Sequence, residues 1–266
     1  MSELTELLGV CADAARRGGA VARDRFGQRR TIEFKGGIDL VTDGDKASEA
    51  AILELIQARC PGAAVLAEES GASGGAAGRL RFIVDPVDGT TNYAHAVPHF
   101  AVNVAVEDER GLAAGATYDP LREELFLAAR GQGATLDGKP IRASREGELG
   151  RSVLSTGFPY DVHQDPEPPL RLFGAYMRRA RAVRRMGSAA LDLAYVACGR
   201  FDGFWEAKLK PWDLGPGILL VREAGGLVAD FDGGEEMMRK GTVCAAGPAL
   251  HARLMAVLAE VRGAHA

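Results

Sequence analysis

The sequence lacks any run of 18 or more apolar residues, the length that a helix needs to cross a bilayer. Its first 17 residues, MSELTELLGVCADAARR, are mildly acidic and amphipathic, unlike a signal peptide. We therefore expect a cytoplasmic protein that is neither exported nor inserted into a membrane.

Cysteine and histidine are both scarce. The four cysteines lie far apart without a C-x-x-C pair, which argues against a disulfide framework and a cysteine-ligated zinc site. None lies in a glycine-rich loop with a nearby arginine, so a cysteine nucleophile is unsupported. The five histidines lack metal-ligand spacing, and the nucleotide loop G-x-x-x-x-G-K-[ST] is absent.

The chain also lacks a large excess of charge of either sign. Its 32 basic and 36 acidic residues give a net charge of −4, which makes nucleic acid and anionic membranes unlikely partners. Apolar residues make up 47% and charged residues 26%, so disordered, collagen-like and coiled-coil classes are excluded. A length of 266 residues suits two small domains or one large one.

Hydrophobic periodicity predicts helices alternating with groups of short strands. The predicted helices span 4–26, 46–59, 170–180, 188–198, 214–223 and 248–261. The predicted strands are 64–67, 80–84, 100–106, a meander over 112–144, 152–156, 182–186, 204–206, 227–231 and 242–246. Segments 71–78 and 161–169 are predicted surface loops. This order indicates a layered α+β fold and not a regular βαβ repeat.

The segment 82–92 carries the most informative pattern. An apolar strand leads to Asp85, and Pro86 keeps Asp85 out of helical geometry, so we expect the chain to turn there. Asp88 follows three residues later, and such a turn can aim both carboxylates and the Val87 carbonyl at one point. Ligands that are all oxygen suit hard cations such as Mg²⁺.

The residues after Asp88 suit an anion. Gly89 permits close approach of a ligand to the backbone, and free N–H groups at Thr90 and Thr91, where a turn or helix would begin, could hold a phosphate. The alternative is two ordinary strand-end turns, Asp-Pro and Asp-Gly. The whole string, with its two threonines, favours a functional site.

Further acidic residues follow other predicted strands or precede helices. Glu68 and Glu69 end a short strand, although adjacent glutamates are more often solvated surface residues. Asp213 precedes a helix and could act as its N-cap, a role compatible with binding a metal. Asp43 or Asp45 could cap the second helix in the same way.

Several strings match a known family in the family's own order. They are DLVTDGD (39–45), AEES (67–70), DPVDGTTNYAH (85–95), TGFPYD (156–161), GSAALDLAYVACGRFDGFWE (187–206) and WDLGPGILLVREAGG (212–226). Together they resemble the inositol monophosphatase family of Mg²⁺-dependent, lithium-sensitive phosphatases, in the superfamily that includes fructose-1,6-bisphosphatase. The resemblance covers nearly the whole chain.

The resemblance implies a metal centre that binds two or three Mg²⁺ ions, with Mn²⁺ as a possible substitute. Glu68, Asp85 and the Val87 carbonyl would bind the first ion, and Asp85, Asp88 and Asp213 the second. A third, weaker ion would be held largely through water near Glu68. Thr90 and Asp45 would orient or deprotonate the attacking water, so Glu68, Thr90 and Asp45 are the expected catalytic residues. The expected substrate contacts are Gly89, Thr90, Gly187, Ser188, Ala189 and Glu206.

The chain departs from the family at several positions. Ala67 replaces a glycine, and Gly215-Pro216 replaces small alanine-type residues, where Pro216 is acceptable in a first helical turn. Gly44 and Ser188 could alter water placement and substrate preference slightly. The expected metal ligands are all present.

The family implies a five-layered α/β/α/β/α sandwich and a homodimer. Residues 1–145 would form a half that carries most metal ligands, and residues 146–266 a half with the substrate contacts and Asp213. The expected function is Mg²⁺-dependent hydrolysis of inositol monophosphate or a similar polyol phosphate, without a phosphoenzyme.

Two alternatives stay open. The substrate could be histidinol phosphate, a 3′-phosphonucleotide or fructose 1,6-bisphosphate, because the metal site does not distinguish the alcohols. The second alternative is a transcription-associated binding role, because one bacterial branch of the family has such a role. Its candidate surface is a basic stretch that we interpret first as a solvated helix face: Arg171, Arg178, Arg179, Arg181, Arg184 and Arg185.

Overall fold

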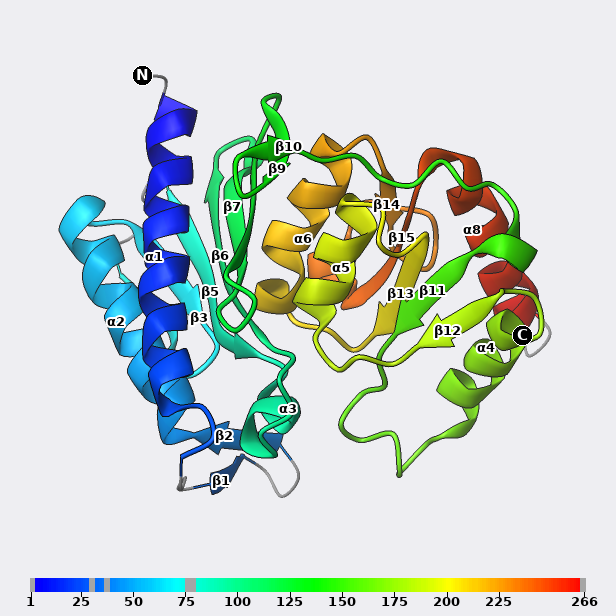
Figure 1. The fold of residues 1–266 in the computed structure, drawn as a ribbon, viewed down its shortest axis with the longest axis horizontal. Helices are drawn as coiled ribbons and strands as arrows, with labels where there is room; N and C mark the ends of the chain where they lie inside the picture. The colour runs from blue at the N-terminus through cyan, green and yellow to red at the C-terminus, as the bar shows by residue number, and fades with distance from the viewer. Residues whose placement is uncertain (1–2, 29–31, 36–38, 75–79, 264–266) are drawn as a thin grey trace.

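The computed structural model describes residues 3–28, 32–35, 39–74 and 80–263, with the backbone alone for 32–35 and 39–41. Two sheets alternate with three helix layers (Figure 1). Helices α1 (Glu3–Arg25) and α2 (Asp43–Arg59) cover the outside of the first sheet. Helices α5 (Ala189–Ala197) and α6 (Pro211–Glu223) lie between the sheets, and α4 (Glu167–Met177) and α8 (Pro248–Gly263) cover the second. The predicted α/β/α/β/α sandwich is confirmed.

Within the described residues, the first sheet has eight strands in the order β10-β9-β8-β7-β6-β5-β3-β4. Strands β3 and β5 are parallel, and the other neighbours are antiparallel. The bounds are β3 Ala64–Ala67, β4 Gly71–Ser73, β5 Arg81–Asp88, β6 Ala101–Asp108, β7 Gly111–Asp119, β8 Glu124–Ala129, β9 Gly133–Leu136 and β10 Lys139–Pro140. Strands β7 to β10 form the predicted meander.

The second sheet has five strands in the order β12-β11-β13-β15-β14. The bounds are β11 Val153–Thr156, β12 Ala182–Arg184, β13 Gly203–Ala207, β14 Leu227–Ala229 and β15 Thr242–Ala246. Strands β11 and β13 are parallel, so their carboxyl ends, Thr156 and Ala207, meet at one edge. The strands of the two sheets fall on either side of residue 145, and the division into two halves stays a prediction.

Short elements complete the described chain. They are the antiparallel pair β1 Ile32–Lys35 and β2 Asp39–Thr42, helices α3 Thr90–Ala94 and α7 Met237–Lys240, and the 3₁₀ turn Leu149–Arg151. The predicted loop 71–78 was wrong at β4, and its residues 75–78 lie outside the described ranges. The predicted loop 161–169 was wrong at its end, because α4 begins at Glu167. No helix in the described ranges is long and apolar enough to span a membrane.

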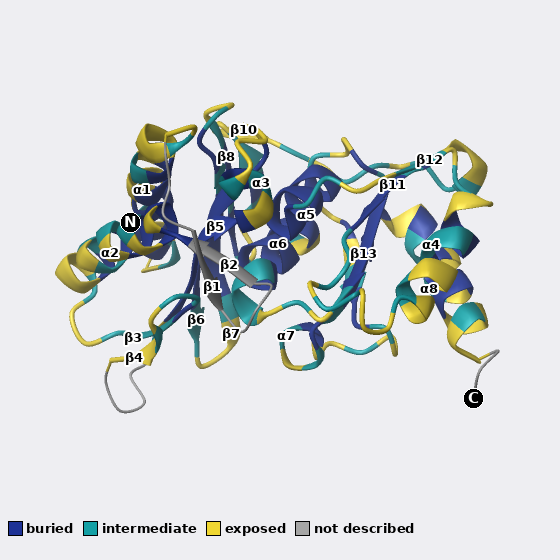
Figure 2. Cartoon of the chain, turned by 90° about the horizontal axis from the view of Figure 1, so that it is seen from below, coloured by how far each residue is buried: buried dark blue, intermediate teal, exposed yellow. Residues whose placement is uncertain are grey.

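The central helix layer is largely buried (Figure 2). All residues of α5 are buried, as is the run 214–221 of α6. Small side chains allow this close packing: a Cβ at Gly217 would lie 2.5 Å from Leu193, and one at Gly215 would lie 3.2 Å from Ala105. The N-termini of α5 and α6 are therefore fixed relative to both sheets.

The predicted starts of two helices were wrong, and the difference matters for the site. Helix α2 begins at Asp43 with Thr42 as N-cap, so neither Asp43 nor Asp45 is the cap; the Thr42 hydroxyl accepts from the Gly44 and Asp45 N–H groups. Helix α6 begins at Pro211, so Asp213 is its third residue. Its carboxylate accepts from the Lys210 N–H at 2.6 Å. Asp45 and Asp213 each occupy the third position of their helix, from which a side chain can accept a hydrogen bond from the N–H of the N-cap residue.

Because α6 begins early, Pro216 lies in the helix interior and not in its first turn as predicted. A proline has no N–H, which leaves the carbonyl four residues earlier, that of Trp212, without its helical donor. The Asn103 side chain supplies one at 3.1 Å, and the Thr117 hydroxyl donates to the Asn103 amide oxygen at 2.7 Å. A side-chain bridge from the first sheet therefore replaces the missing bond.

Strand β5 does not turn at Asp85, which corrects the prediction for this segment. It continues to Asp88, and its register against β6 shifts between Asp85, opposite Asn103, and Asp88, opposite Ala101. Pro86 is tolerated because a bulge needs no N–H at the inserted residue. In a regular strand, residues three apart point to opposite faces. The inserted residue brings the carboxylates of Asp85 and Asp88 to one side.

Candidate metal and phosphate site

A cavity of about 240 Å³ lies at the end of β5, beside the first turns of α5 and α6. It brings together the predicted site residues from five segments of the chain, with the exception of Asp45. Those that line it are Glu68, Asp85, Val87, Asp88, Gly89, Thr90, Gly187, Ser188, Ala189, Glu206 and Asp213.

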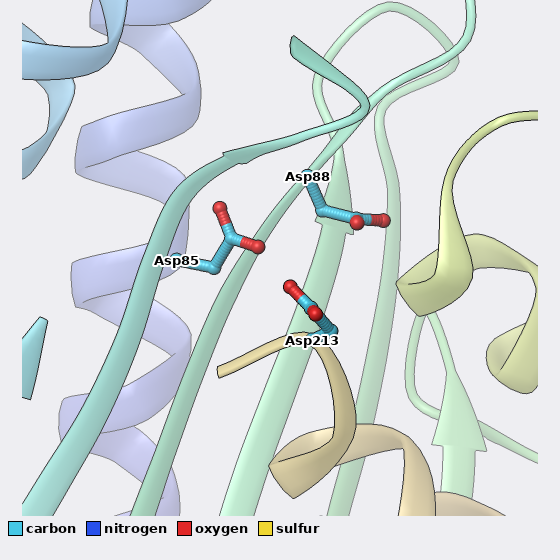
Figure 3. A group of neighbouring side chains, drawn as sticks. All are labelled: Asp85, Asp88 and Asp213. Carbon is cyan, nitrogen blue, oxygen red and sulfur yellow. The ribbon is translucent and has the colours of Figure 1, made fainter. Parts of the chain in front are cut away.

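Three carboxylates converge in this cavity (Figure 3). Asp85 and Asp88 come from β5 and Asp213 from α6, and one oxygen of each lies within 4.8 Å of the others. Asp85 is 1% exposed and Asp88 is 8% exposed. Such a group of buried oxygen donors fits a divalent cation, which would offset the repulsion among the three negative charges.

Burial and mutual repulsion raise the pKa values of these carboxyl groups. Burial is the largest cause at each one. The pKa of Asp85 lies well above its usual value because of burial, the charges of Glu68, Asp88 and Asp213, and hydrogen bonding with Glu68. Burial raises the pKa of Asp88 to about 6, and burial with the Asp88 charge raises the pKa of Asp213 to about 7. Without a metal, these carboxyl groups therefore keep their protons to a higher pH than exposed carboxyl groups do.

Asp88 is anchored to the N-terminus of α5. Its Oδ2 accepts from the Ser188 hydroxyl and, at 2.8 Å, from the Ala190 N–H. The Ser188 hydroxyl also accepts from the Leu191 N–H at 3.3 Å, as the helix N-cap. The positive end of the helix dipole thus lies next to the Asp88 charge.

Bonds within the bulge and from α2 position the rest of β5. Asp85 accepts from the Val87 N–H at 3.0 Å, and the Ser48 hydroxyl donates to the Pro86 carbonyl at 3.1 Å. The Thr90 hydroxyl donates to the Val87 carbonyl at 3.1 Å, which links the predicted catalytic threonine to a predicted metal ligand.

Glu49 holds the segment that carries Glu68. Its carboxylate, on α2, accepts from the Glu69 N–H at 2.8 Å and from the Ser70 N–H at 2.9 Å. Sequence reasoning missed Glu49, because a glutamate on an amphipathic helix reads as a solvated residue; here it is 4% exposed.

Asp45 lies apart from the cavity lining. It is fully buried at the start of α2, where Thr42 donates to its Oδ2 through both the N–H and the hydroxyl. Its Oδ1 has no hydrogen-bond partner among the residues that the structure describes. Burial raises the pKa of Asp45 to about 6. Oδ1 of Asp45 is therefore available to accept a hydrogen bond from a water molecule. The predicted role of Asp45 stays a prediction.

Glu206 is the buried carboxyl group on the other side of the cavity. Its carboxylate packs on Gly157, where a Cβ would lie 2.2 Å from either oxygen. Burial first, and then the charge of Asp213, raise the pKa of Glu206 to about 8. A cation bound at Asp213 would offset the second cause. Asp192 of α5, which sequence reasoning missed, is also buried, and burial and the Glu206 charge raise its pKa well above the usual value.

Basic side chains line the cavity as well: Arg185, Lys208 and Lys210. Arg185 belongs to the predicted basic stretch, whose interpretation as one helix face was wrong. Only Arg171 lies within α4, Arg184 ends β12, and the rest fall in the segments between elements. The Arg185 guanidinium lies 6.0 Å from the centre of the Phe158 ring, and both residues line the cavity.

Gly89 and Asn92 join the two sides of the site. Gly89 has a φ of +96°, and a Cβ there would lie 2.9 Å from the Gly187 carbonyl oxygen. The Asn92 amide donates to the carbonyls of His99 and Met186, both at 2.9 Å. Sequence reasoning quoted Asn92 within a motif but gave it no role, because its partner at Met186 is distant in the sequence.

We expect Asn92→Ala to destabilise the protein by about 1–3 kcal/mol, because two carbonyls lose their donor. The 187–189 segment should also shift, so KM should rise. Urea unfolding and steady-state kinetics would check this, with His95→Ala, an exposed residue that does not line the cavity, as the control. Unchanged stability and KM in Asn92→Ala would show that this bridge is dispensable.

Comparison with known proteins decides the family. The sequence profile described as "Inositol monophosphatase family" matches residues 3–262. The chain belongs to the inositol monophosphatase family. It is 42% identical to the Nus factor SuhB of Escherichia coli (strain K12) over 258 residues, 96% of each chain. It is 40% identical to the inositol-1-monophosphatase of Synechocystis sp. over 259 residues, 97% of this chain and 90% of that one.

A solved structure agrees with this membership. The inositol monophosphatase from Anabaena (Nostoc) sp. superposes with a TM-score of 0.88 at 39% identity and covers 97% of each chain. Membership in the inositol monophosphatase family supports phosphatase activity on a phosphate ester and dependence on a metal. The cluster of Asp85, Asp88 and Asp213 is where this family member could bind that metal.

Proposed function

We propose that the protein is a Mg²⁺-dependent phosphomonoesterase that hydrolyses inositol monophosphate or a similar small polyol phosphate. The observation that carries this proposal is the convergence of Asp85, Asp88 and Asp213 beside Gly89 and Thr90, in a member of the inositol monophosphatase family. Carboxylates for a cation and backbone amides for an anion share one cavity, as a phosphate ester requires.

Glu68, Asp85 and the Val87 carbonyl would hold the first ion. Asp85, Asp88 and Asp213 would hold the second, and a third would lie near Glu68. Mg²⁺, or Mn²⁺ in its place, supplies Lewis-acid activation of water and neutralises charge on the phosphate ester when bound. We expect Li⁺ to inhibit.

The protein's own groups would complete the reaction. The Thr90 hydroxyl and the Asp45 carboxylate hold and deprotonate the attacking water, and the raised pKa of Asp45 suits a group that accepts a proton near neutral pH. The Gly89 and Thr90 amides donate to phosphate oxygens, where negative charge develops in the transition state. Arg185 and Lys210 add positive charge at the same cavity. The water attacks phosphorus directly, so no covalent phosphoenzyme forms.

The alcohol portion of the substrate would lie against Gly187, Ser188 and Ala189, within reach of Glu206. A carboxylate that accepts from neighbouring hydroxyls favours a polyol. Screening the purified protein with Mg²⁺ against inositol, sugar, histidinol and nucleotide phosphates tests this assignment. A kcat/KM highest for histidinol phosphate, a 3′-phosphonucleotide or fructose 1,6-bisphosphate would move the assignment to that substrate.

Glu206→Gln is expected to weaken inositol phosphate use by about 1.5–3 kcal/mol, the range for hydrogen bonds to a charged group. Hydrolysis of an aryl phosphate, which has no such hydroxyls, should hardly change. The measurement is kcat/KM for both substrates in both proteins, because the ratio cancels any damage to the metal site. Equal losses on the two substrates, or none on either, would contradict polyol recognition.

A second candidate function is a transcription-associated binding role. The name of the E. coli relative, Nus factor SuhB, favours it. Capture of transcription proteins from a lysate of the source cell by a turnover-deficient variant would support this role. Retained turnover with no such capture would favour the enzyme alone. We also expect a homodimer, which light scattering would test.

A further inference from the structure

A second cavity, of about 400 Å³, adjoins the candidate site. The two cavities share six lining residues: Gly157, Phe158, Pro159, Glu206, Ala207 and Lys208. These residues lie at or just after the carboxyl ends of β11 and β13, a parallel pair of the second sheet. Gly157, which follows β11, has no side chain, and the Glu206 carboxylate packs against it, so Glu206 lies at the boundary between the two cavities.

The two cavities lie on opposite faces of β13. Phe204 packs in the apolar cluster with α5 and α6, and Glu206, two residues on, lies on the same face of the strand. Trp205 packs in the other cluster, with α4 and α8, and lines the second cavity. The second cavity therefore continues the site around the end of the strand, away from the metal ligands.

The chemistry of the second cavity differs from that of the first. Its apolar lining includes Phe158, Leu172, Trp205, Phe231 and Val261.

The basic residues at this cavity already have acidic partners. Lys208 binds Asp161 at 2.7 Å, Arg262 binds Asp232 at 2.7 Å, and Arg171 lies 3.8 Å from Glu167. Pairing neutralises these charges, so the cavity suits an apolar group and not a second phosphate. Its volume falls in the range of small-molecule sites.

We infer that the second cavity is a subsite for an apolar or aromatic extension of the alcohol, so that the protein binds phosphate esters larger than a simple polyol phosphate. This inference rests on the proposed function, because it places the phosphate in the first cavity. The extension passes the Glu206 side chain and Ala207 and packs on Trp205. A compact ester fills the first cavity alone.

The test compares two non-hydrolysable ligands, propylphosphonate and 3-phenylpropylphosphonate, by calorimetry on the Mg²⁺-loaded protein. They share the phosphonate and differ in the ring, so the ratio of their affinities reports the subsite. We expect the phenyl compound to bind at least about tenfold more tightly, from burial of the ring. The kcat/KM values of the corresponding phosphate esters should show the same preference.

Val261→Trp fills the subsite from α8 and should bring the affinity ratio close to one. Ala259→Trp is the matched control, because Ala259 is an exposed residue of the same helix that does not line the cavity, and should keep the wild-type ratio. Pro168→Trp, from an exposed position on the α4 side of the cavity, repeats the test if Val261→Trp does not fold.

The inference would be overturned by equal affinities for the two ligands in the wild type, or by a preference that survives both cavity-filling variants. Equal affinities are also expected if a second copy of the chain covers the cavity. Inositol phosphate hydrolysis by the same preparation separates the two proposals. If the protein hydrolyses inositol phosphate but does not prefer the phenyl compound, only the subsite is contradicted. If it prefers the phenyl compound but does not hydrolyse inositol phosphate, the proposed function is contradicted and the second cavity is a binding site only.

Discussion

Asp213→Asn is expected to lower kcat by about two orders of magnitude or more, because the second ion loses an anionic ligand. The fold should not suffer. Asparagine can still accept from the Lys210 N–H, as Asp213 does at 2.6 Å. The substitution also removes one of three charges that repel each other in the metal-free site, so its free energy of unfolding should equal or exceed that of the wild type.

Steady-state kinetics at saturating Mg²⁺, together with urea unfolding in a chelator, would test this prediction. Asp230→Asn is a useful contrast, because Asp230 is fully buried outside the cavity and accepts from the Asp232 and Gly234 N–H groups. That variant should lose stability and keep the ligands of the site. A near-normal kcat in Asp213→Asn would show that Asp213 only caps the helix and does not bind a catalytic ion.

The metal-free protein is expected to lose stability as the pH rises from about 6.5 to 8, by about 1–3 kcal/mol. Folding raises the pKa of Asp213 to about 7 and that of Glu206 to about 8, above their usual values of 3.8 and 4.5. In this window the folded state holds more protons than the unfolded state, so raising the pH favours unfolding. His99, whose pKa burial lowers to about 4 from a usual value of 6.5, acts in the opposite direction mainly below this window.

Bound Mg²⁺ should remove the part of this pH dependence that comes from Asp213, because the cation favours the deprotonated carboxylate, and should leave much of the part from Glu206, whose pKa is raised first by burial. Urea unfolding at several pH values, with a chelator and with Mg²⁺, would measure both effects. Asp213→Asn should show a shallower slope in chelator and a smaller stabilisation by Mg²⁺. A stability that is constant or rises between pH 6.5 and 8 without metal would contradict the electrostatic account of the site.

The sequence alone predicts most elements, because amphipathic periods are local. It does not predict how helix α5 is used. Residues 189–197 are apolar apart from Asp192, so no polar face shows where the helix lies, and the structure places it between the two sheets with every residue buried. The helix starts were wrong by three residues at α2 and α6, because Thr42 and Lys210 occupy the cap positions instead of the aspartates.

The acidic residues of the site could be found from their motifs, but the way they are held could not. The bulge that turns Asp85 and Asp88 to one side depends on pairing with β6. Glu49 and Asn92 act through backbone groups of distant segments, and neither residue differs in type from an ordinary surface residue. Arg185 reaches the cavity because of the path between β12 and α5, which no local pattern encodes.

Phosphate release from inositol 1-phosphate before and after exhaustive chelation tests the central claim most directly. The predicted result is release in Mg²⁺, its loss in chelator and its return when Mg²⁺ is restored, because the ligands proposed for the cations are oxygen atoms of the chain. Full activity after exhaustive chelation would contradict the assignment of Asp85, Asp88 and Asp213 as ligands of catalytic ions.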